Sequence, residues 1–330
     1  MMNFLKSTCL AAAVLATAGI ATADTLKVSH IRPQGATIDN ELRSFAADLS
    51  AATGGSLELN LFPASALGDY TSVQERISIG AIDMAVQPAA TAVDRRMQIS
   101  AFPYVAANWT EAKEIYGPGG AIHGAMKDLY AKQDITMLAA YPVYFGGVAL
   151  NTDAVSPGDP MAAKGIKVRV PGIKSFQLTA DALGYISSPI PFSEAFTAVQ
   201  TGVVDGVVGS GAEGYYASFR DVTTTYVPVN THFEVWYMII NSGSLAELSG
   251  DDRAALEAAA LTFEATRWTT AEADQGAFEQ KLADNGATIV SLSAEELSAT
   301  AAHVRALVWP QVLEDVGQEW GQAILDKIAQ

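Results

Sequence analysis

The chain has 330 residues, 49% of them hydrophobic, and a formal net charge of −16. Because single hydrophobic cores stop growing beyond about 250–300 residues, this length and composition predict two lobes. The negative charge repels nucleic acid and anionic membrane surfaces, which excludes both as partners and requires any anion site to be a local, buried basic feature.

The amino-terminal residues predict a cleaved leader. Lys6 precedes an apolar run over residues 9–20, and Ala-Thr-Ala at residues 21–23 offers the small residues that signal peptidase reads. The run is shorter than the roughly 20 residues that span a bilayer. We therefore expect cleavage after Ala23, a periplasmic location and no stable membrane insertion afterwards. Cys9, the only cysteine of the chain, would leave with the leader, so the mature protein would carry no disulfide.

Residues 26–86 alternate between strand-like and helix-like hydrophobic patterns. Strands are expected over 26–30, 57–62 and 82–86, with helices over 37–53 and 69–79. This alternation predicts a parallel sheet with helical crossovers, and ligands gather at the carboxyl ends of such strands. His30 and Gln87 stand at these ends and are candidate ligand contacts.

The middle of the chain predicts a crossing between lobes and a second α/β set. Helices expected over 109–116 and 121–133 lead into a long strand over 136–144, which ends before Gly146 and is suited to pass from one lobe to the other. Strands or extended segments then follow over 167–170, 187–191 and 203–208, with helices over 174–183 and 193–200. Residues 226–241 predict two more strands with a bend near His232.

The carboxyl-terminal third is predicted to be helical. Residues 249–252 and 293–296 resemble capping boxes ahead of apolar-periodic runs, and Pro310 is expected to kink the second of these helices. Long terminal helices suit a brace across two lobes. We expect residues 24–140 to form mainly the first lobe and 141–240 mainly the second, with 241–330 returning to the first lobe and bracing both.

Arg169 is the leading candidate for anion recognition. It alternates with Val168 and Val170 near the carboxyl end of a strand, just before a Pro-Gly break. If the valines face apolar layers, the guanidinium points toward the cleft, where its planar fork suits bidentate capture of a carboxylate. A surface arginine in a structural ion pair is the alternative, and the segment alone favours neither.

A second candidate segment covers residues 209–216. Gly209 and other small residues at a strand end let a ligand approach the backbone, where it would meet Glu213, Tyr215 and Tyr216. Other aromatic residues could line a site for an apolar or ring-shaped ligand, although each also suits the core. They are Tyr144, Phe145, Phe192 and Trp236.

Taken in order along the chain, these motifs resemble the DctP-like solute-binding subunits of tripartite ATP-independent periplasmic (TRAP) transporters. The resemblance covers essentially the whole mature chain. It is carried by Val-Ser-His at 28–30, Phe-Pro-Ala-Ser-Ala-Leu-Gly at 62–68, Ile-Gly-Ala-Ile-Asp-Met at 79–84, Phe-Pro-Tyr at 102–104 and the segments 165–172 and 189–206.

The resemblance implies an α/β fold of the two-lobed periplasmic binding protein type, with mixed sheets, flanking helices, shared interlobe strands and a long hinge-crossing helix. It also implies that the two lobes close on one small organic acid, that Arg169 pairs with the ligand carboxylate, and that the protein hands the ligand to TRAP permease subunits in the membrane.

Two departures from the family pattern concern the ligand. Many members carry Gln-Glu-Asn after Val-Asp-Gly, with the Asn touching the ligand, whereas residues 207–209 here are Val-Val-Gly. A second arginine often found on the strand after the interlobe crossing has no counterpart around residues 146–149. A dicarboxylate, a sugar acid, a keto acid and an aromatic acid therefore all remain open as the ligand.

The sequence carries no pattern typical of an enzyme. It lacks a Gly-x-Ser-x-Gly elbow and the nucleotide-binding glycine motifs, and its four histidines are far apart and form no zinc pattern. We therefore expect no catalysis, no cofactor and no metal site. Two other binding functions compete: an ABC-type binding protein and a ligand-sensing subunit for a membrane receptor.

Overall fold

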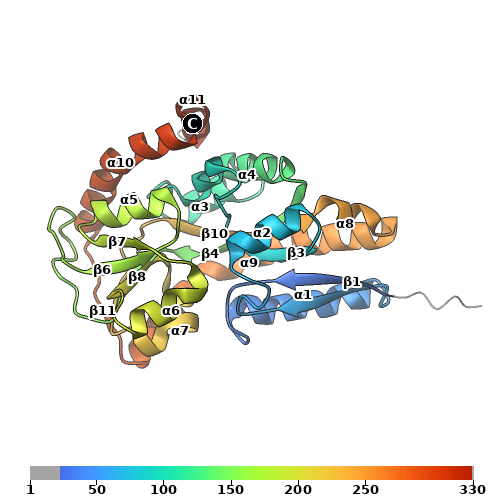
Figure 1. Ribbon diagram of the computed structural model, residues 1–330, viewed down its shortest axis with the longest axis horizontal. Coiled ribbons are helices and arrows are strands. Elements are labelled where there is room, and N and C mark those ends of the chain that lie inside the picture. Colours follow the sequence, from blue (N-terminus) through green and yellow to red (C-terminus); the bar gives the residue numbers. More distant parts are fainter. Residues whose placement is uncertain (1–22, 329–330) are drawn as a thin grey trace, which may run out of the picture.

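The computed structural model describes residues 23–328, so nearly all of the expected leader lies outside the described residues. Figure 1 shows two halves, each built on a mixed sheet with helices around it. The first sheet has the strand order β2-β1-β3-β10-β4, with β1 parallel to β2 and β3, and β10 antiparallel to β3 and β4. Its strands are β1 (Asp24–Ser29), β2 (Leu57–Phe62), β3 (Met84–Gln87), β4 (Ile135–Phe145) and β10 (Phe233–Asn241).

The second sheet has the order β11-β9-β5-β8-β6-β7, in which β6 is parallel to both β7 and β8 while β5 is antiparallel to β8 and β9. Its strands are β5 (Gly147–Leu150), β6 (Lys167–Val170), β7 (Ile186–Pro189), β8 (Gly206–Ser210), β9 (Thr225–Val227) and β11 (Thr288–Ile289). The two sheets with their helices confirm the predicted two-lobed α/β class.

Two of the points at which the chain passes from one sheet to the other touch each other. One lies at Gly146, between β4 and β5, and the other lies between β9 and β10. The Gly146 amide donates to the His232 carbonyl oxygen over 2.8 Å, and the Thr231 amide donates to the Gly146 carbonyl oxygen over 2.9 Å. A Cβ atom at residue 146 would lie 2.3 Å from His232 Cε1, so this close approach requires glycine.

Helices cover both sheets (Figure 1). Those of the first lobe are α1 (Thr37–Ala52), α2 (Tyr70–Ser78), the 3-10 helix η1 (Arg95–Ala101), α3 (Trp109–Tyr116), α4 (Ala121–Ala131) and α8 (Ser242–Glu247). Those of the second lobe are α5 (Lys174–Ala182), α6 (Phe192–Gln200), α7 (Ala212–Phe219) and the 3-10 helix η2 (Arg220–Val222). Helix α7 and η1 are additions to the elements that the sequence predicted.

Long carboxyl-terminal helices join the two lobes. Helix α9 (Gly250–Asp284) has 35 residues and packs against α1 and β4 of the first lobe and against α7 and β11 of the second. Helix α10 (Ala294–Val316) packs against α5 and η1, and α11 (Gln318–Ile328) packs against α4. Among the described helices, none combines the length and the apolar character that a membrane span requires.

The predicted caps differ in how completely they form. The Ser293 side chain accepts from the Glu296 amide, and the Glu296 side chain accepts from the Ser293 amide, which completes a capping box. Ser249 also caps its helix, but the carboxylate of Asp252 accepts from the hydroxyls of Ser249 and Ser56 instead of the Ser249 amide. Helix α10 continues through Pro310 to Val316.

Candidate functional site

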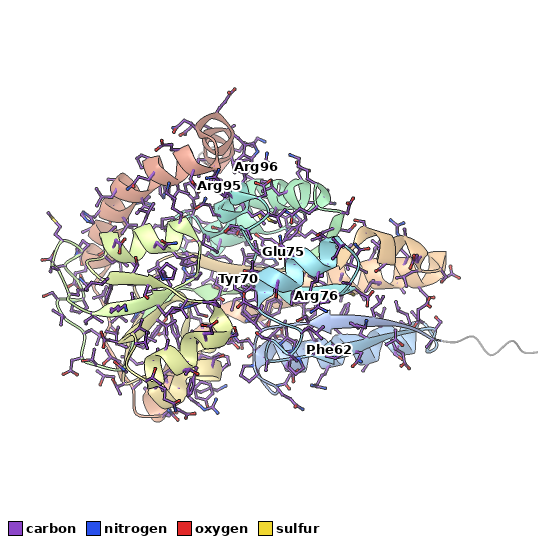
Figure 2. The ribbon with its side chains drawn as sticks, in the orientation of Figure 1. Phe62, Tyr70, Glu75, Arg76, Arg95 and Arg96 are labelled. Carbon is purple, nitrogen blue, oxygen red and sulfur yellow. The ribbon has the colours of Figure 1, made fainter. Side chains whose placement is uncertain are left out.

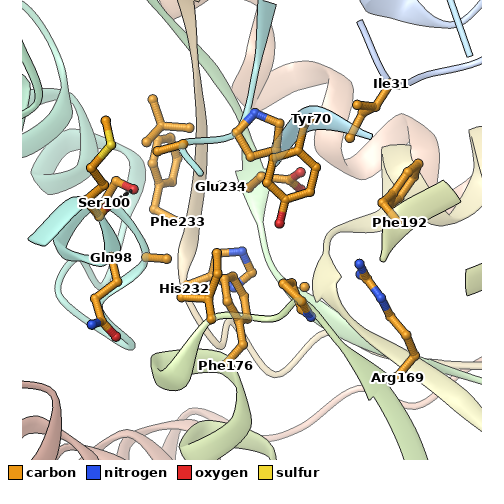
Figure 3. A pocket seen from close by; sticks show the side chains of 18 of the residues that line it. Ile31, Tyr70, Gln98, Ser100, Arg169, Phe176, Phe192, His232, Phe233 and Glu234 are labelled. Carbon is orange, nitrogen blue, oxygen red and sulfur yellow. Dashed lines mark hydrogen bonds between the residues drawn. The ribbon is translucent and has the colours of Figure 1, made fainter. Parts of the chain in front are cut away.

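A small cavity lies between the two sheets, beside the point where the chain crosses from one lobe to the other (Figure 3). Its volume is about 50 Å³, and both lobes contribute to its wall. The strands β1, β3, β6 and β8 end toward it, as expected for parallel strands in a ligand-binding α/β fold. Most lining side chains are apolar, among them Ile31, Met97, Ile173, Phe176, Phe192 and Phe233.

Arg169 is a buried cation at this cavity. Its side chain is carried by β6 and is 2% exposed. The Nε atom donates to the Ile190 carbonyl oxygen over 2.8 Å, and the guanidinium carbon lies 5.7 Å from the centre of the Phe192 ring. No carboxylate among residues 23–328 forms an ion pair with it. Burial lowers the pKa of Arg169, because the charge has lost water without gaining a counter-ion.

The far end of the Arg169 side chain faces open space. Figure 3 shows its guanidinium pointing into the cavity, opposite the hydroxyl of Tyr70. Gly209, at the end of β8, lies beside the guanidinium: a Cβ atom at this position would lie 2.8 Å from Pro171 Cδ and 3.7 Å from Arg169 Nη1. The alternation of residues 168–170 thus places the guanidinium toward the cleft, as the sequence suggested, and Arg169 is not the exposed surface arginine of the alternative interpretation.

Arg32 is a second buried arginine on the cavity wall, and the sequence reasoning missed it. It follows β1 and is 1% exposed. Unlike Arg169 it is paired with carboxylates: Nε donates to Glu213 Oε2 over 3.0 Å, and Nη2 donates to Ser210 Oγ over 2.8 Å and to Glu234 Oε1 over 3.4 Å. Burial alone lowers the pKa of Arg32, but the two carboxylates outweigh it and the pKa is raised.

The small residues at 209–214 make this second arrangement possible. A Cβ atom at Gly214 would lie 2.3 Å from Arg32 Nη2 and 2.1 Å from Ser210 Oγ, so only glycine admits the guanidinium here. The sequence predicted that small residues let something approach the backbone, and Arg32 occupies that space. The indole ring of Trp236 lies beneath the guanidinium, with its centre 4.7 Å from the guanidinium carbon.

Two neutral polar groups complete the cavity wall. His232 Nδ1 lies 2.9 Å from Thr231 Oγ1, while the buried Nε2 has no hydrogen-bond partner within the protein. Burial lowers the pKa of His232 to about 3, so the imidazole is neutral at physiological pH. Burial also raises the pKa of Tyr70 to about 12, so this phenol keeps its proton. Figure 2 labels Tyr70 and Glu75, both on α2; the side chain of Tyr70 is buried, whereas that of Glu75 is exposed.

The predicted site residues divide into those that line the cavity and those that surround it. Arg169, Phe192 and Gly209 line it. Glu213 and Trp236 lie behind this wall, where Glu213 contacts the lining residue Arg32 and Trp236 contacts Arg32 and Glu234.

Two predicted polar residues point elsewhere. His30 bonds to Asp39 through Nε2 at 3.2 Å, and the Gln87 amide donates to the Tyr70 carbonyl oxygen over 2.8 Å. Both are fully buried. His30 ties the segment after β1 to α1, and Gln87 ties the end of β3 to the start of α2.

Four predicted aromatic residues pack around the cavity without lining it. The Tyr144 hydroxyl accepts from Arg267 Nη2 over 2.9 Å, and the Tyr215 hydroxyl donates to the Gly147 carbonyl oxygen over 2.8 Å. Phe145 packs edge-to-face on Trp109 and Phe233, and Tyr216 packs against Phe278. Within residues 23–328 no group of three His, Cys, Asp or Glu side chains is placed to hold a metal ion.

Comparison with known proteins places this chain in one family. The family model described as bacterial extracellular solute-binding protein, family 7 (DctP), matches residues 28–314. A solute-binding protein of Roseobacter denitrificans is 27% identical over 94% of this chain and 93% of its own length. The C4-dicarboxylate-binding periplasmic protein DctP of Rhodobacter capsulatus is 27% identical over 91% of this chain and 87% of its own length.

Solved structures show the same fold. The crystal structure of DctP7, an extracytoplasmic solute receptor of Bordetella pertussis that binds pyroglutamic acid, superposes with a TM-score of 0.81 at 22% identity, covering 93% of this chain and 100% of the other. Because the family model spans most of the sequence, the chain belongs to the DctP family of TRAP solute-binding proteins, and it is a binding protein of a transport system and not an enzyme.

Proposed function

We propose that this protein is secreted to the periplasm, captures a small organic carboxylate in the cavity between its lobes, and delivers it to a TRAP permease in the membrane. The observation that carries the proposal is the state of Arg169. It is a buried cation with no counter-ion among the described residues, and its Nη atoms face the cavity.

A carboxylate would satisfy what Arg169 lacks. Burying an unpaired charge costs free energy, and a bidentate carboxylate both neutralises the guanidinium and accepts two charge-assisted hydrogen bonds. The Nε bond to Ile190 fixes the guanidinium before the ligand arrives, which reduces the ordering that binding must impose. The Bordetella receptor and the Rhodobacter protein bind acids of different shape, pyroglutamic acid and C4-dicarboxylates, and a carboxylate is the group these ligands share.

The cavity wall supports a ligand with a mainly apolar body. Most of the side chains on the cavity wall are aromatic or aliphatic, and the position where the family pattern has a ligand-contacting Asn is Gly209 here. Apolar ligand atoms would gain from the removal of this surface from water. A polyhydroxylated sugar acid would find few partners for its hydroxyl groups.

The proposal is tested by screening the mature protein for thermal stabilisation by organic acids, because a ligand that binds only the folded state raises the melting temperature. The best acid is then titrated by calorimetry into wild type, Arg169→Ala and Arg169→Lys. We expect Arg169→Ala to lose several kcal/mol of binding free energy, about a hundredfold or more in affinity. Arg169→Lys keeps the charge without the fork and should recover part of it.

Arg220→Ala, which removes an exposed arginine from the second lobe, serves as the matched control and should bind normally. Near-normal affinity of Arg169→Ala would refute the carboxylate role. Delivery is tested separately by uptake into vesicles that contain the small and large permease subunits. Uptake of the acid should require the wild-type protein and should fail with Arg169→Ala.

A further inference from the structure

We infer that the cavity selects monocarboxylates and rejects dicarboxylates, because its second arginine, Arg32, is already neutralised by Glu213 and Glu234. This inference rests on the proposed function and names the ligand class of the same site. Arg32 lines the cavity, but its charge is already balanced by protein carboxylates.

The cavity wall carries two arginines, one paired with carboxylates and one without a counter-ion among the described residues. Arg32 pairs with Glu213 at 3.0 Å and with Glu234 at 3.4 Å. Glu234 is held in turn by the Ser210 hydroxyl at 2.8 Å and the Trp236 Nε1 atom at 2.9 Å. These contacts fix both carboxylates beside Arg32, whereas Arg169 has only the neutral Ile190 carbonyl. The one positive charge left open at the cavity wall of the described structure is therefore that of Arg169.

A second ligand carboxylate would find no unpaired cation on the described wall of this cavity. Arg32 and Arg169 are the only cationic side chains on its described wall, and Glu234 lines it as well. A dianion would thus bring its second charge against apolar side chains or toward the Glu234 carboxylate. Desolvation of an unpaired charge and repulsion between like charges both oppose this. Burial raises the pKa of Glu234, because its carboxylate has lost water, and the nearby Glu213 carboxylate acts in the same direction.

The opposite side of the cavity offers neutral recognition instead. His232 Nε2 is buried, lacks a protein partner and belongs to a ring on the cavity wall (Figure 3). A neutral imidazole nitrogen can exchange one hydrogen bond with an amide, hydroxyl or carbonyl group of the ligand. The ligand class that fits is a monocarboxylate with a compact apolar body and one neutral polar group away from the carboxylate.

The test compares acids that differ in charge but not in size. Calorimetry at pH 7.5 measures the binding of succinate, glutarate and adipate and of their half-amides, which keep one carboxylate and replace the other with a neutral amide. Wild type should bind the best half-amide at least about tenfold more tightly than its diacid. In Glu213→Gln/Glu234→Gln, where Arg32 is no longer neutralised, affinity for a diacid should rise at least about tenfold.

Glutamine keeps the shape of both side chains and can still bond to Ser210 and Trp236, and circular dichroism with thermal unfolding checks that the double variant folds. The single variant Glu213→Gln, which leaves the Glu234 contacts in place, should show a smaller gain. Glu58→Gln/Glu314→Gln makes the same change in net charge at exposed positions and should keep the wild-type preference.

A wild-type preference for any diacid over its half-amide overturns the inference. So does a folded double variant whose affinity for every diacid stays at the wild-type value. Failure of the proposed function looks different: no monocarboxylate of any kind would then bind wild type in a manner that depends on Arg169.

Discussion

Two arginines on one cavity wall show how differently the same side chain can be used. Arg169 and Arg32 are both buried, yet the first has a single neutral acceptor and the second has two carboxylates and a hydroxyl. The free energy of a buried charge depends on this pairing more than on burial itself. An unpaired cation destabilises the folded chain and gains from a ligand, whereas a paired one holds the chain together.

This contrast predicts opposite effects of the same substitution on stability in the absence of ligand. Arg169→Met removes an uncompensated buried charge and should leave the melting temperature unchanged or higher, while abolishing the rise that a ligand produces. Arg32→Met leaves Glu213 and Glu234 buried without their partner and should cost about 3–5 kcal/mol of unfolding free energy. Denaturant unfolding of both variants decides the matter. A large loss of stability in Arg169→Met would show that this arginine is structural.

A site residue could be predicted from the sequence where its direction depends only on its neighbours in the chain. The alternation of valines around Arg169 fixes the direction of its side chain, because successive strand residues point to opposite faces. Arg32 follows its strand in an irregular segment, so no periodicity gives its direction. Its partners Ser210, Glu213 and Glu234 lie 178, 181 and 202 residues away in the sequence. A pairing across such separations depends on the folded arrangement of the two lobes.

At the scale of helices and strands, too, the elements determined by nearby residues were predicted, whereas one stabilised by distant packing was missed. The start of α10 and the strands β2 and β6 follow from capping residues and alternation that lie within each segment. Helix α7 was missed because residues 209–214 are rich in glycine and favour a strand end or turn. It packs along α9, and that long-range packing stabilises a helix whose own sequence does not.

The local origin of the α10 start can be measured. Ser293→Ala removes the hydroxyl that accepts from the Glu296 amide and breaks the capping box. We expect a loss of about 1 kcal/mol in the free energy of unfolding. Ser298→Ala is the matched control, because Ser298 is an exposed residue inside the same helix and alanine is the better helix former there. Denaturant titrations should give the control a midpoint equal to or slightly above that of wild type. Equal midpoints for Ser293→Ala would contradict the role of the cap.

At the scale of the whole molecule, the two lobes are joined by narrow crossings and long helices. The chain crosses at Gly146 and again just before β10, and α9 and α10 each contact both lobes. Composition and element order were enough to predict two interleaved lobes. How closely they approach was not predictable, because it depends on side chains such as Tyr70 and Arg169 that come from opposite lobes and meet only in the folded protein.

The arrangement of two lobes around a ligand cavity predicts that binding draws them together, since a hinge at the crossings can open and close the cleft. Glu75 on α2 and Glu194 on α6 are exposed residues of opposite lobes. Cysteines at these positions would be the only thiols once a leader containing Cys9 is removed, so spin labels can be attached at these two sites alone.

Pulsed electron resonance then measures the distance between the labels with and without the acid found in the thermal screen. We expect a broad, longer distribution for the free protein and a narrow, shorter one at saturation, because the free cation of Arg169 holds the lobes together only when a carboxylate bridges it to the opposite wall. Labels at Glu194 and Asp181, both exposed on the second lobe, provide the control and should keep their distance. A Glu75–Glu194 distance that is the same with and without bound acid would mean that the lobes form a rigid unit and that the ligand enters by another route.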